Sequence, residues 1–440
     1  MKLNRKILIT PLLALTLALS GCDSDDDDDG SVEGDASTVD ADGGTTEGDD
    51  TGATEGDDTG ATEGDDTGTA DDNTDVSAAL PRAVIASIDS GFTSAVIDLV
   101  DVEEPFTVEG SLNPGVSDTI VRTFGDKYFV IRRFMSDSIA AYSINDPTTP
   151  LYEVSTNSDT EEASSNPHDL VFLNEEKAYL LRYGSPIVWI VNPSVTDPEN
   201  FKIGELDLSA YDADGVPEAT RGAIVGDRLF IVMQRLENFV PTQPGFVAVF
   251  DTETDTEIET RTNDFLPGIE LPAFNPSELS VDTESDTLFI SALGDFGAFD
   301  GSRPSSLTGG LVTVDATDFS ASQLIDDDVN RTGRMLNVEI ASASVGYLVT
   351  STEPDDNSGP EEVSLEQFNP VTGSIDIRGV AGLSEVDVRD VAIGPAGNLW
   401  VAIGDPVMPR VVVINPSDNN SIVTDQIMTT LNPSNIAFTQ

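Results

Sequence analysis

The sequence predicts an all-β protein built from repeated four-stranded units, preceded by a segment that cannot form a core. Two observations support this prediction. From about Leu80 to Gln440 no long amphipathic helical pattern occurs, and short β-branched and aromatic segments alternate with turns of Gly, Pro, Asn and Asp, which is typical of strands. These segments also recur at a regular spacing, which indicates a repeat architecture.

The most distinct repeated segment is a tight turn followed by an apolar strand. A short apolar strand precedes each copy, and a third strand that ends in Asn or Asp follows it. A weaker fourth segment, such as Asp255 to Glu259, usually comes next. Four antiparallel strands per unit are typical of a propeller blade. The six copies of the turn and strand are GDKYFVI from Gly125, EEKAYLL from Glu175, GDRLFIV from Gly226, SDTLFIS from Ser285, VGYLVTS from Val345 and GNLWVAI from Gly397.

The spacing of the strand-ending residues supports this interpretation. Successive markers lie 44, 47, 59, 64, 54 and 46 residues apart, which is blade length. The 25 residues after the last marker and the short stretch before the first together make one more blade. The last segment, Asn432 to Phe438, opens like the blade that begins Asn166-Pro167-His168. We therefore expect a seven-bladed β-propeller over 80–440, in which the C-terminal strand completes the N-terminal blade and leaves no free edge. The markers are Asp101, Asn145, Asn192, Asp251, Asp315, Asn369 and Asn415.

The charge of the chain is large and uneven. The 440 residues contain 80 acidic and 21 basic residues, a formal charge of −59. Residues 23–79 hold 22 of the acids and no base, whereas the 361 residues that follow hold 58 acids and 18 bases. Such acidity excludes nucleic acid and anionic membrane surfaces as partners, and it suggests exposure to high salt or divalent cations. One Cys and one His exclude a disulfide framework, a Cys/His zinc site and a Cys–His dyad.

Residues 1–21 have the layout of a secretory signal, with three bases, a short apolar run and then small residues. The segment Leu19-Ser20-Gly21-Cys22 resembles the lipobox of bacterial lipoproteins. This resemblance implies cleavage before Cys22, lipidation of that residue and anchoring without a transmembrane helix; a plain signal peptide with an incidental Cys is the alternative. Asp23 resembles an inner-membrane retention signal, but Asp25 to Asp29 resembles a surface-export signal. We favour the outer membrane or the cell surface, within the cell envelope.

Residues 22–79 are expected to form a disordered tether after the lipidated Cys22. Residues 23–79 are rich in Asp, Gly and Thr, contain no aromatic residue, and include the octad TEGDDTGA twice and TEGDDTGT once. Such a segment cannot bury a core, and its reach is at least roughly 40 Å. The Gly-Asp-Asp repeats superficially resemble calcium-binding repeats, but the apolar positions that stack a β-roll do not occur. A solvated spacer is therefore favoured over an ordered calcium site.

The repeated unit resembles the YVTN or lactonase-like seven-bladed propellers, which include secreted and lipid-anchored bacterial proteins. The resemblance rests on blades that open with Asn-Pro followed by His or Ser, and on third strands such as Val411-Val412-Val413-Ile414-Asn415-Pro416. No blade has the Gly-His and Trp-Asp pattern of WD40 repeats. Asn369-Pro370-Val371-Thr372-Gly373 lacks the Trp that follows in quinoprotein repeats, which disfavours a quinone cofactor. No cofactor is expected, with Ca²⁺ as the one alternative.

One face of the ring is predicted to bind a ligand or partner. In propellers of this kind the openings of the innermost strands share a face with the loops between second and third strands. The extra residues of the longer blades fall on that face, so we expect the partner over blades four to six. These residues are Ala210 to Thr220, Arg235 to Pro244, Leu293 to Gly309 and Glu353 to Pro360.

The rim of the axial channel holds the candidate chemical groups. His168, Asp169, Glu278 and Asp390 are the candidate catalytic residues, and the three carboxylates are candidate ligands of a divalent metal. A structural role is the stronger alternative, because carboxylates at strand openings often pair with Arg or accept from backbone N–H groups. Trp189 and Trp400 are expected in the blade core. Four more residues are expected at the rim: Arg221, Glu339, Arg389 and Asn435.

Two functions follow from these observations. The first is a non-enzymatic binding or scaffold module at the cell envelope, which presents its loop-rich face to an envelope protein, a polymer or a nutrient. The second is a lactonase-like or metal-dependent hydrolase that uses the acidic rim. In both cases the protein is expected to be a monomer that contacts the membrane only through its lipid anchor.

Overall fold

The computed structural model describes residues 80–159, 163–261, 265–297, 304–327, 333–352 and 362–440. The expected signal sequence, Cys22 and the tether lie outside these residues. None of the helices in the described ranges is long and apolar enough to cross a bilayer. These helices are short 3₁₀ turns: η2 (Pro198–Asn200), η3 (Ser209–Tyr211), η4 (Val380–Gly382) and η5 (Pro416–Asp418).

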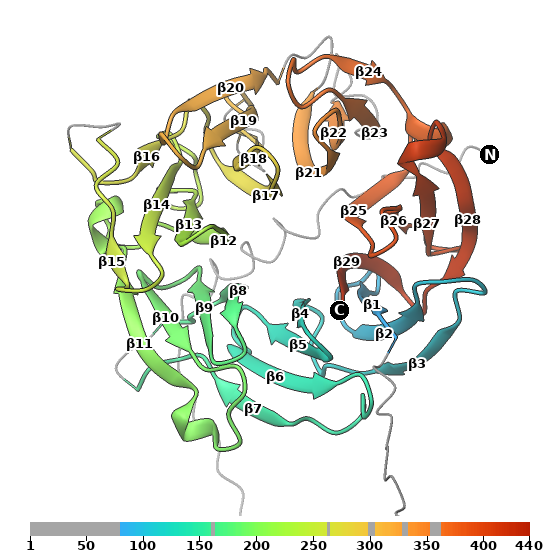
Figure 1. Cartoon of the computed structure of the whole chain (residues 1–440), viewed down its shortest axis with the longest axis horizontal. Helices are drawn as coiled ribbons and strands as arrows, with labels where there is room; N and C mark the ends of the chain where they lie inside the picture. The colour runs from blue at the N-terminus through green and yellow to red at the C-terminus, as the bar shows by residue number, and fades with distance from the viewer. Residues whose placement is uncertain (1–79, 160–162, 262–264, 298–303, 328–332, 353–361) are drawn as a thin grey trace, which may run out of the picture. The chain divides into compact units, whose positions relative to one another are not determined.

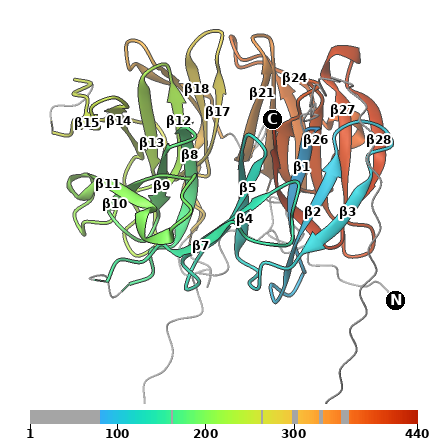
Figure 2. The same cartoon turned by 60° about the horizontal axis from the view of Figure 1, so that its bottom comes forward.

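The described residues form seven antiparallel sheets arranged as a ring, and each sheet is one blade (Figure 1). Figure 2 shows the sheets standing side by side, with their strands running along the axis of the ring. We number the blades 1 to 7 along the chain. From the innermost strand outward, blade 1 contains β29 (Asn432–Phe438), β1 (Arg82–Ile88), β2 (Ala95–Asp101) and β3 (Val108–Leu112), and blade 2 contains β4 (Thr119–Phe124), β5 (Lys127–Arg132), β6 (Ser138–Ser143) and β7 (Tyr152–Ser155). In the same order, blade 3 contains β8 (Pro167–Asn174), β9 (Lys177–Arg182), β10 (Ile187–Val191) and β11 (Lys202–Asp207), and blade 4 contains β12 (Ala219–Val225), β13 (Arg228–Met233), β14 (Phe246–Asp251) and β15 (Thr256–Glu257), with β16 (Ile269–Glu270) also paired with β14.

The last three blades follow the same order: blade 5 contains β17 (Pro276–Asp282), β18 (Thr287–Ala292), β19 (Gly310–Asp315) and β20 (Ala321–Ile325); blade 6 contains β21 (Arg334–Ser342), β22 (Val345–Thr352), β23 (Glu362–Phe368) and β24 (Ile375–Ile377); and blade 7 contains β25 (Asp387–Ile393), β26 (Leu399–Gly404), β27 (Arg410–Asn415) and β28 (Ser421–Met428).

The closure predicted from the two ends of the chain is confirmed. Strand β29 pairs antiparallel with β1, from Ala83 opposite Phe438 to Ile88 opposite Asn432, and Figure 1 shows this C-terminal strand beside the N-terminal one. The backbone groups of β1 are therefore paired on both sides, with β29 and with β2. This pairing closes the ring without leaving an open edge on β1.

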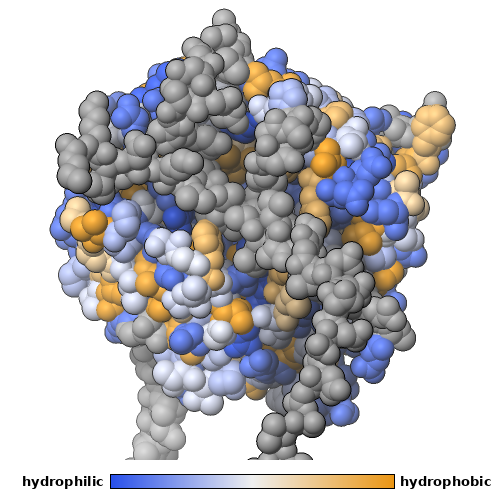
Figure 3. All heavy atoms as spheres, turned by 180° about the vertical axis from the view of Figure 1, so that it is seen from behind, coloured by the Kyte–Doolittle hydropathy of each residue, from blue (hydrophilic) through white to orange (hydrophobic). Residues whose placement is uncertain are grey.

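The core lies between the blades. Each pair of neighbouring blades shares a cluster of buried apolar side chains, and the seven clusters of the described residues complete the circle. Trp189 lies in the cluster between blades 2 and 3, and Trp400 in the cluster between blades 7 and 1, as predicted. On the face that Figure 3 shows, apolar residues lie in small groups among polar ones.

Most of the Asn and Asp residues that end the third strands form turns, whereas Asp101 lies within β2 and pairs with Arg82. In five blades the side-chain oxygen accepts a hydrogen bond from the backbone N–H two residues later, the geometry of an Asx turn. The fourth segment of blade 4 is shorter than expected, because β15 spans only Thr256–Glu257 and β16 occupies another stretch of the same edge of β14. The five turn-forming residues are Asn192, Asp251, Asp315, Asn369 and Asn415.

Candidate functional site

The innermost strands share an irregularity near their first residues. In six blades the pairing between the first and second strands shifts register there, as in a β-bulge; blade 2 pairs without a shift. The residue that follows the shift is polar in every case. These residues occupy corresponding places around the axis, and we call them the polar ring: Asp169, Arg221, Glu278, Asn337, Asp390 and Asn435.

The polar ring lies on the face that also carries the loops between second and third strands. In blade 4, for example, Ala219 at the opening of β12 pairs with Met233, and the loop Arg235–Pro244 follows directly. The same arrangement holds in blade 5, where Pro276 pairs with Ala292. We call this side the loop face. The prediction that strand openings and long loops share a face is therefore confirmed for blades 4 and 5, whereas Glu353 to Pro360 of blade 6 lies outside the described residues.

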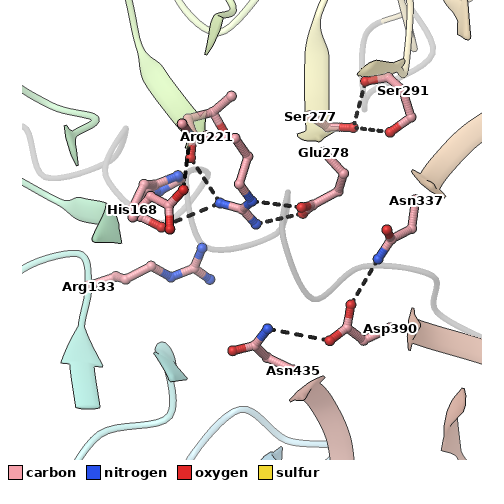
Figure 4. Close-up of polar contacts among 12 residues, drawn as sticks. Arg133, His168, Arg221, Ser277, Glu278, Ser291, Asn337, Asp390 and Asn435 are labelled. Carbon is pink, nitrogen blue, oxygen red and sulfur yellow. Dashed lines mark hydrogen bonds and ion pairs between the residues drawn. The ribbon is translucent and has the colours of Figure 1, made fainter. Parts of the chain in front are cut away.

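Asp169 and Glu278 are each held by an arginine from a neighbouring blade. Arg122 donates from Nε to Asp169 Oδ1 at 2.6 Å, and the backbone N–H of Gly222 donates to Oδ2 at 3.0 Å. Arg221 binds Glu278 through both Nε and Nη2, at 2.6 and 2.5 Å (Figure 4). Such charge-assisted and bidentate contacts are the stronger kind of protein hydrogen bond. Both carboxylates thus connect one blade to the next.

Asp390 and Glu339 bind amide and hydroxyl groups. Asn337 donates to Asp390 Oδ1 at 2.9 Å (Figure 4), and the backbone N–H of Ile436 donates to Oδ2 at 2.7 Å. Burial raises the pKa of Asp390 to about 6, and the nearby charge of Glu278 acts in the same direction. Glu339 accepts from the backbone N–H of Ile393 at 2.9 Å and from Ser280 at 3.1 Å, and burial raises its pKa to about 7.

The three candidate metal ligands lie in separate contacts. Asp169, Glu278 and Asp390 belong to blades 3, 5 and 7, and each is bound to a different set of protein groups. Within the part of the chain that the structure describes, no three His, Cys, Asp or Glu side chains are placed together to hold a metal ion. The contacts found are those of the structural alternative, carboxylates that join strands and blades. A ligating or catalytic role of these residues stays a prediction.

His168 differs from the carboxylates because its ring has an unpaired nitrogen. It is the residue that the register shift of blade 3 adds to β8, and its ring stacks on Tyr183 with centroids 4.2 Å apart. The residue is 8% exposed, and Nδ1 has no hydrogen-bond partner among the described residues. Burial lowers the pKa of His168 well below its ordinary value, and the charges of Arg133, Arg221 and Arg122 lower it further. The imidazole is therefore neutral at neutral pH.

Three residues of this site were not predicted from the sequence: Arg133, Arg122 and Tyr183. Arg133 follows β5, and its Nε and Nη2 contact Asp118 Oδ1 at 2.7 and 2.5 Å. Figure 4 shows its guanidinium pointing to the same region as His168 and the guanidinium of Arg221. A spacing signal existed for some of these contacts, because bonded partners lie about one blade apart in sequence: 47 residues for Arg122 and Asp169, and 57 for Arg221 and Glu278.

Two further residues expected at the rim also have defined contacts. Arg389 binds Asp387 through Nε and Nη2 at 2.8 Å, and its Nη1 is buried without a partner among the described residues. Asn435 accepts from the backbone N–H of Val121 at 2.8 Å and donates to Asp390 at 3.3 Å. Both residues therefore lie within the network of contacts at the strand openings.

The ring of seven blades, its closing strand and the polar residues at the strand openings define a seven-bladed β-propeller that resembles the lactonase-like propellers. A candidate 6-phosphogluconolactonase from Bacteroides uniformis matches with a TM-score of 0.53 and 13% identity, over 82% of this chain and 100% of that one. One from Bacteroides fragilis matches with a TM-score of 0.53 and 12% identity, over 83% and 99%. The periplasmic gluconolactonase of Pseudomonas aeruginosa matches with a TM-score of 0.50 and 15% identity, over 82% and 99%. At these identities the likeness concerns the fold alone.

The comparisons of sequence give no further assignment. No family model matches the chain, and no curated protein matches it.

Proposed function

We propose that the protein is a lipid-anchored binding module of the cell envelope whose binding surface is the loop face of the propeller. The observation that carries this proposal is the loop Arg235–Pro244 of blade 4. At its tip Phe239 is 51% exposed and has a positive φ of 64°, next to Asn238 at 52°. A bulky residue in this conformation is strained, and such strain persists only where the surrounding contacts impose it.

The base of this loop is held by several hydrogen bonds. Arg235 donates from Nε to the carbonyl of Tyr211 at 2.6 Å, and the N–H of Leu236 donates to Glu218 at 2.8 Å. Glu237 and Val240 exchange backbone hydrogen bonds of 2.9 and 3.0 Å around the tip. The loop thus displays a large apolar ring on a fixed support, and rigid aromatic side chains of this kind often supply much of the affinity of an interface.

Exposed apolar side chains also occur in three other loops of the same face. Met135 of blade 2 is 69% exposed, Leu307 of blade 5 is 41% exposed, and Val407 of blade 7 is 75% exposed. They surround the axis at the positions where second and third strands connect. An envelope protein, a polymer or a larger nutrient that covers the loop face would bury them together with Phe239.

The test compares two variants of the full chain in capture from envelope extracts after cross-linking. Phe239→Ala removes the apolar ring from the loop face, whereas Val371→Ala removes a side chain of 76% exposure from the opposite face. We expect one stoichiometric partner to bind the native protein and Val371→Ala but not Phe239→Ala. Equal capture by both variants, or no stoichiometric partner at all, contradicts the proposed binding surface.

Anchoring and exposure are tested separately. Cys22→Ser should abolish incorporation of labelled fatty acid and release the protein from the membrane fraction. Shaving of whole cells by protease should remove the propeller if the protein lies at the outer surface. Persistent membrane association of Cys22→Ser contradicts the lipid anchor, and protection of the propeller in intact cells contradicts surface exposure.

A second candidate function is hydrolysis of lactones or esters, as the names of the matched gluconolactonases suggest for proteins of this fold. The observation that favours it is the buried, neutral imidazole of His168, whose Nδ1 lacks a partner among the described residues. Such a group can act as a general base. The test is turnover of a panel of lactones and esters by the native protein and by His168→Ala. No turnover, or turnover that His168→Ala leaves unchanged, excludes this function.

A further inference from the structure

We propose that Glu218 controls the conformation of the loop Arg235–Pro244 through its own protonation. The loop is held in place while the carboxyl group carries its proton, and it is released when the group ionises. This movement is a property of the propeller alone, whereas its effect on a partner rests on the function proposed above. If Phe239 contacts that partner, binding should be stronger in neutral than in alkaline solution.

Glu218 holds the first residues of the loop through its side chain and its backbone. The N–H of Leu236 donates to Oε2 of Glu218 at 2.8 Å. The N–H of Gln234 donates to the carbonyl of Glu218 at 3.2 Å. The N–H of Arg235 donates to the carbonyl of Pro217 at 3.1 Å. Glu218 has a positive φ of 51°, which a residue with a side chain adopts only where its surroundings impose it.

The connection between β11 and β12, residues 208–218, supplies three acids beside the loop and no base. Asp212 accepts from Nε2 of Gln243 at 2.8 Å, near the end of the loop. Asp214 accepts from the N–H of Val216 at 2.8 Å within the connection. The loop is therefore held at its start by Glu218 and near its end by Asp212.

Glu218 is buried without a cation beside it. The residue is 9% exposed, and among the described residues no Lys or Arg forms an ion pair with its carboxyl group. Arg235, the cation of the loop, donates to the carbonyls of Tyr211 and Pro244 at 2.6 and 3.2 Å instead. A carboxyl group is rarely buried in the charged form unless it is paired, and it keeps its proton otherwise.

The groups that surround Glu218 favour the protonated form. Burial raises the pKa of Glu218 to about 8, against the opposing effect of the hydrogen bond from Leu236, and the charges of Asp212 and Asp214 raise it as well. On blade 3, burial raises the pKa of Tyr183, and the charge of Glu218 acts in the same direction. The phenol of Tyr183 therefore stays neutral and offers no counter-charge.

The direction of the pH effect follows from the two states of the loop. In the open loop the carboxyl group is hydrated and ionises near its ordinary value of 4.5. In the closed loop it ionises only near 8. The contribution of Glu218 to closure is therefore complete below pH 4.5 and is lost as the pH rises to about 8, by up to about tenfold in the closed-to-open ratio per pH unit.

The experiment is hydrogen exchange of the full chain between about pH 6 and about pH 9, expressed as protection factors, which correct for the pH dependence of intrinsic exchange. The segment Arg235–Pro244 should lose protection at least about tenfold over this range. The strand Arg228–Met233 reports unfolding of the whole blade and should keep its protection. Constant protection of the loop, or an equal loss in this strand, overturns the proposal.

Two variants identify the controlling group. Glu218→Gln keeps an acceptor for the N–H of Leu236 but cannot ionise, so its loop should remain protected at about pH 9. Glu237→Gln is the matched control, because Glu237 is an exposed acid of the same loop and its replacement removes the same charge; it should lose protection as the native protein does. Equal loss in Glu218→Gln overturns the proposal, and the pH profile of the native protein decides it if this variant fails to fold.

The consequence for binding is tested separately, by capture of the envelope partner at about pH 6 and about pH 9. A loop that loses protection while no partner is captured at either pH contradicts the proposed binding surface and leaves the control of the loop by Glu218 in place. A partner captured by a loop whose protection is independent of pH contradicts the role of Glu218 and leaves the binding surface in place.

Discussion

The native protein should lose stability as the pH rises and Glu339 ionises. Replacing Glu339 by Gln should prevent this loss, because glutamine does not ionise. Burial raises the pKa of Glu339 from 4.5 to about 7, and the charge of Asp390 acts in the same direction. In the unfolded chain the carboxyl ionises near 4.5. Between these two values the folded state holds a proton that the unfolded state has released, so the contribution of Glu339 to the unfolding free energy is highest below pH 4.5 and falls as the pH rises toward 7.

The magnitude follows from the size of the shift. One pKa unit corresponds to about 1.4 kcal/mol, so a shift of about 2.5 units amounts to about 3 kcal/mol of unfolding free energy. A glutamine at this position keeps the hydrogen bonds, because its Oε1 can accept from the N–H of Ile393 and its Nε2 can donate to Ser280 Oγ. The variant therefore avoids the cost of ionisation without losing contacts.

The assay is urea unfolding of the native protein and of Glu339→Gln at about pH 5 and about pH 8. The difference in unfolding free energy between the two proteins should be larger at pH 8 than at pH 5 by about 2 to 3 kcal/mol. Taking the difference removes the titration of groups common to both proteins. Glu362→Gln, at the exposed start of β23, is the control and should differ from the native protein by the same amount at both pH values. If the difference for Glu339→Gln is also independent of pH, the argument from burial is refuted.

Three further perturbations test the fold and the blade contacts. Truncation after Leu431 removes β29 and exposes one edge of β1. We expect either self-association, seen by size-exclusion chromatography, or loss of the cooperative unfolding transition, seen by circular dichroism. A stable monomer would contradict the closure of the ring by β29. Gly346→Ala would place a methyl group 2.4 Å from the Phe368 ring and should cost about 1 to 3 kcal/mol in urea unfolding. Arg221→Met leaves the Glu278 carboxylate without its arginine and should lower the unfolding free energy by about 3 to 5 kcal/mol. Adding Glu278→Leu should restore most of this unfolding free energy. Equal destabilisation of the single and double variants would show that the pair does not act as a unit.

The propeller could be predicted because its signals are local and repeated. Six blades carry a tight turn before the second strand, and all seven carry an Asn or Asp at the end of the third, so the count of blades follows from their spacing. The blade that begins at Arg82 lacks its first strand in the sequence, and the segment Asn432–Phe438 is one strand more than the last blade needs. The sequence therefore identified these two segments as the strands that close the ring, which the pairing of β29 with β1 confirms.

The rim was only partly predictable. Sequence placed Asp169, Glu278 and Asp390 at strand openings, where the structure has them. It could not give their partners, because a propeller brings together residues about one blade apart, and several polar residues at that separation compete. The choice between Arg122 and another base for Asp169 depends on which basic side chain of the neighbouring blade lies within hydrogen-bond distance of that carboxylate.

By itself, the sequence determined an all-β repeat protein of seven blades, its closure by the C-terminal strand, and the division of the negative charge between residues 23–79 and the propeller. These features depend on periodicity, turn chemistry and composition, which are properties of neighbouring residues. The tertiary structure decided which rim carboxylates are bound by arginine or amide groups, and it left the buried imidazole of His168 unpaired beside Arg133. Those contacts depend on the register shifts and on the distances between side chains of different blades, because hydrogen bonds form only over short distances that a linear pattern does not encode.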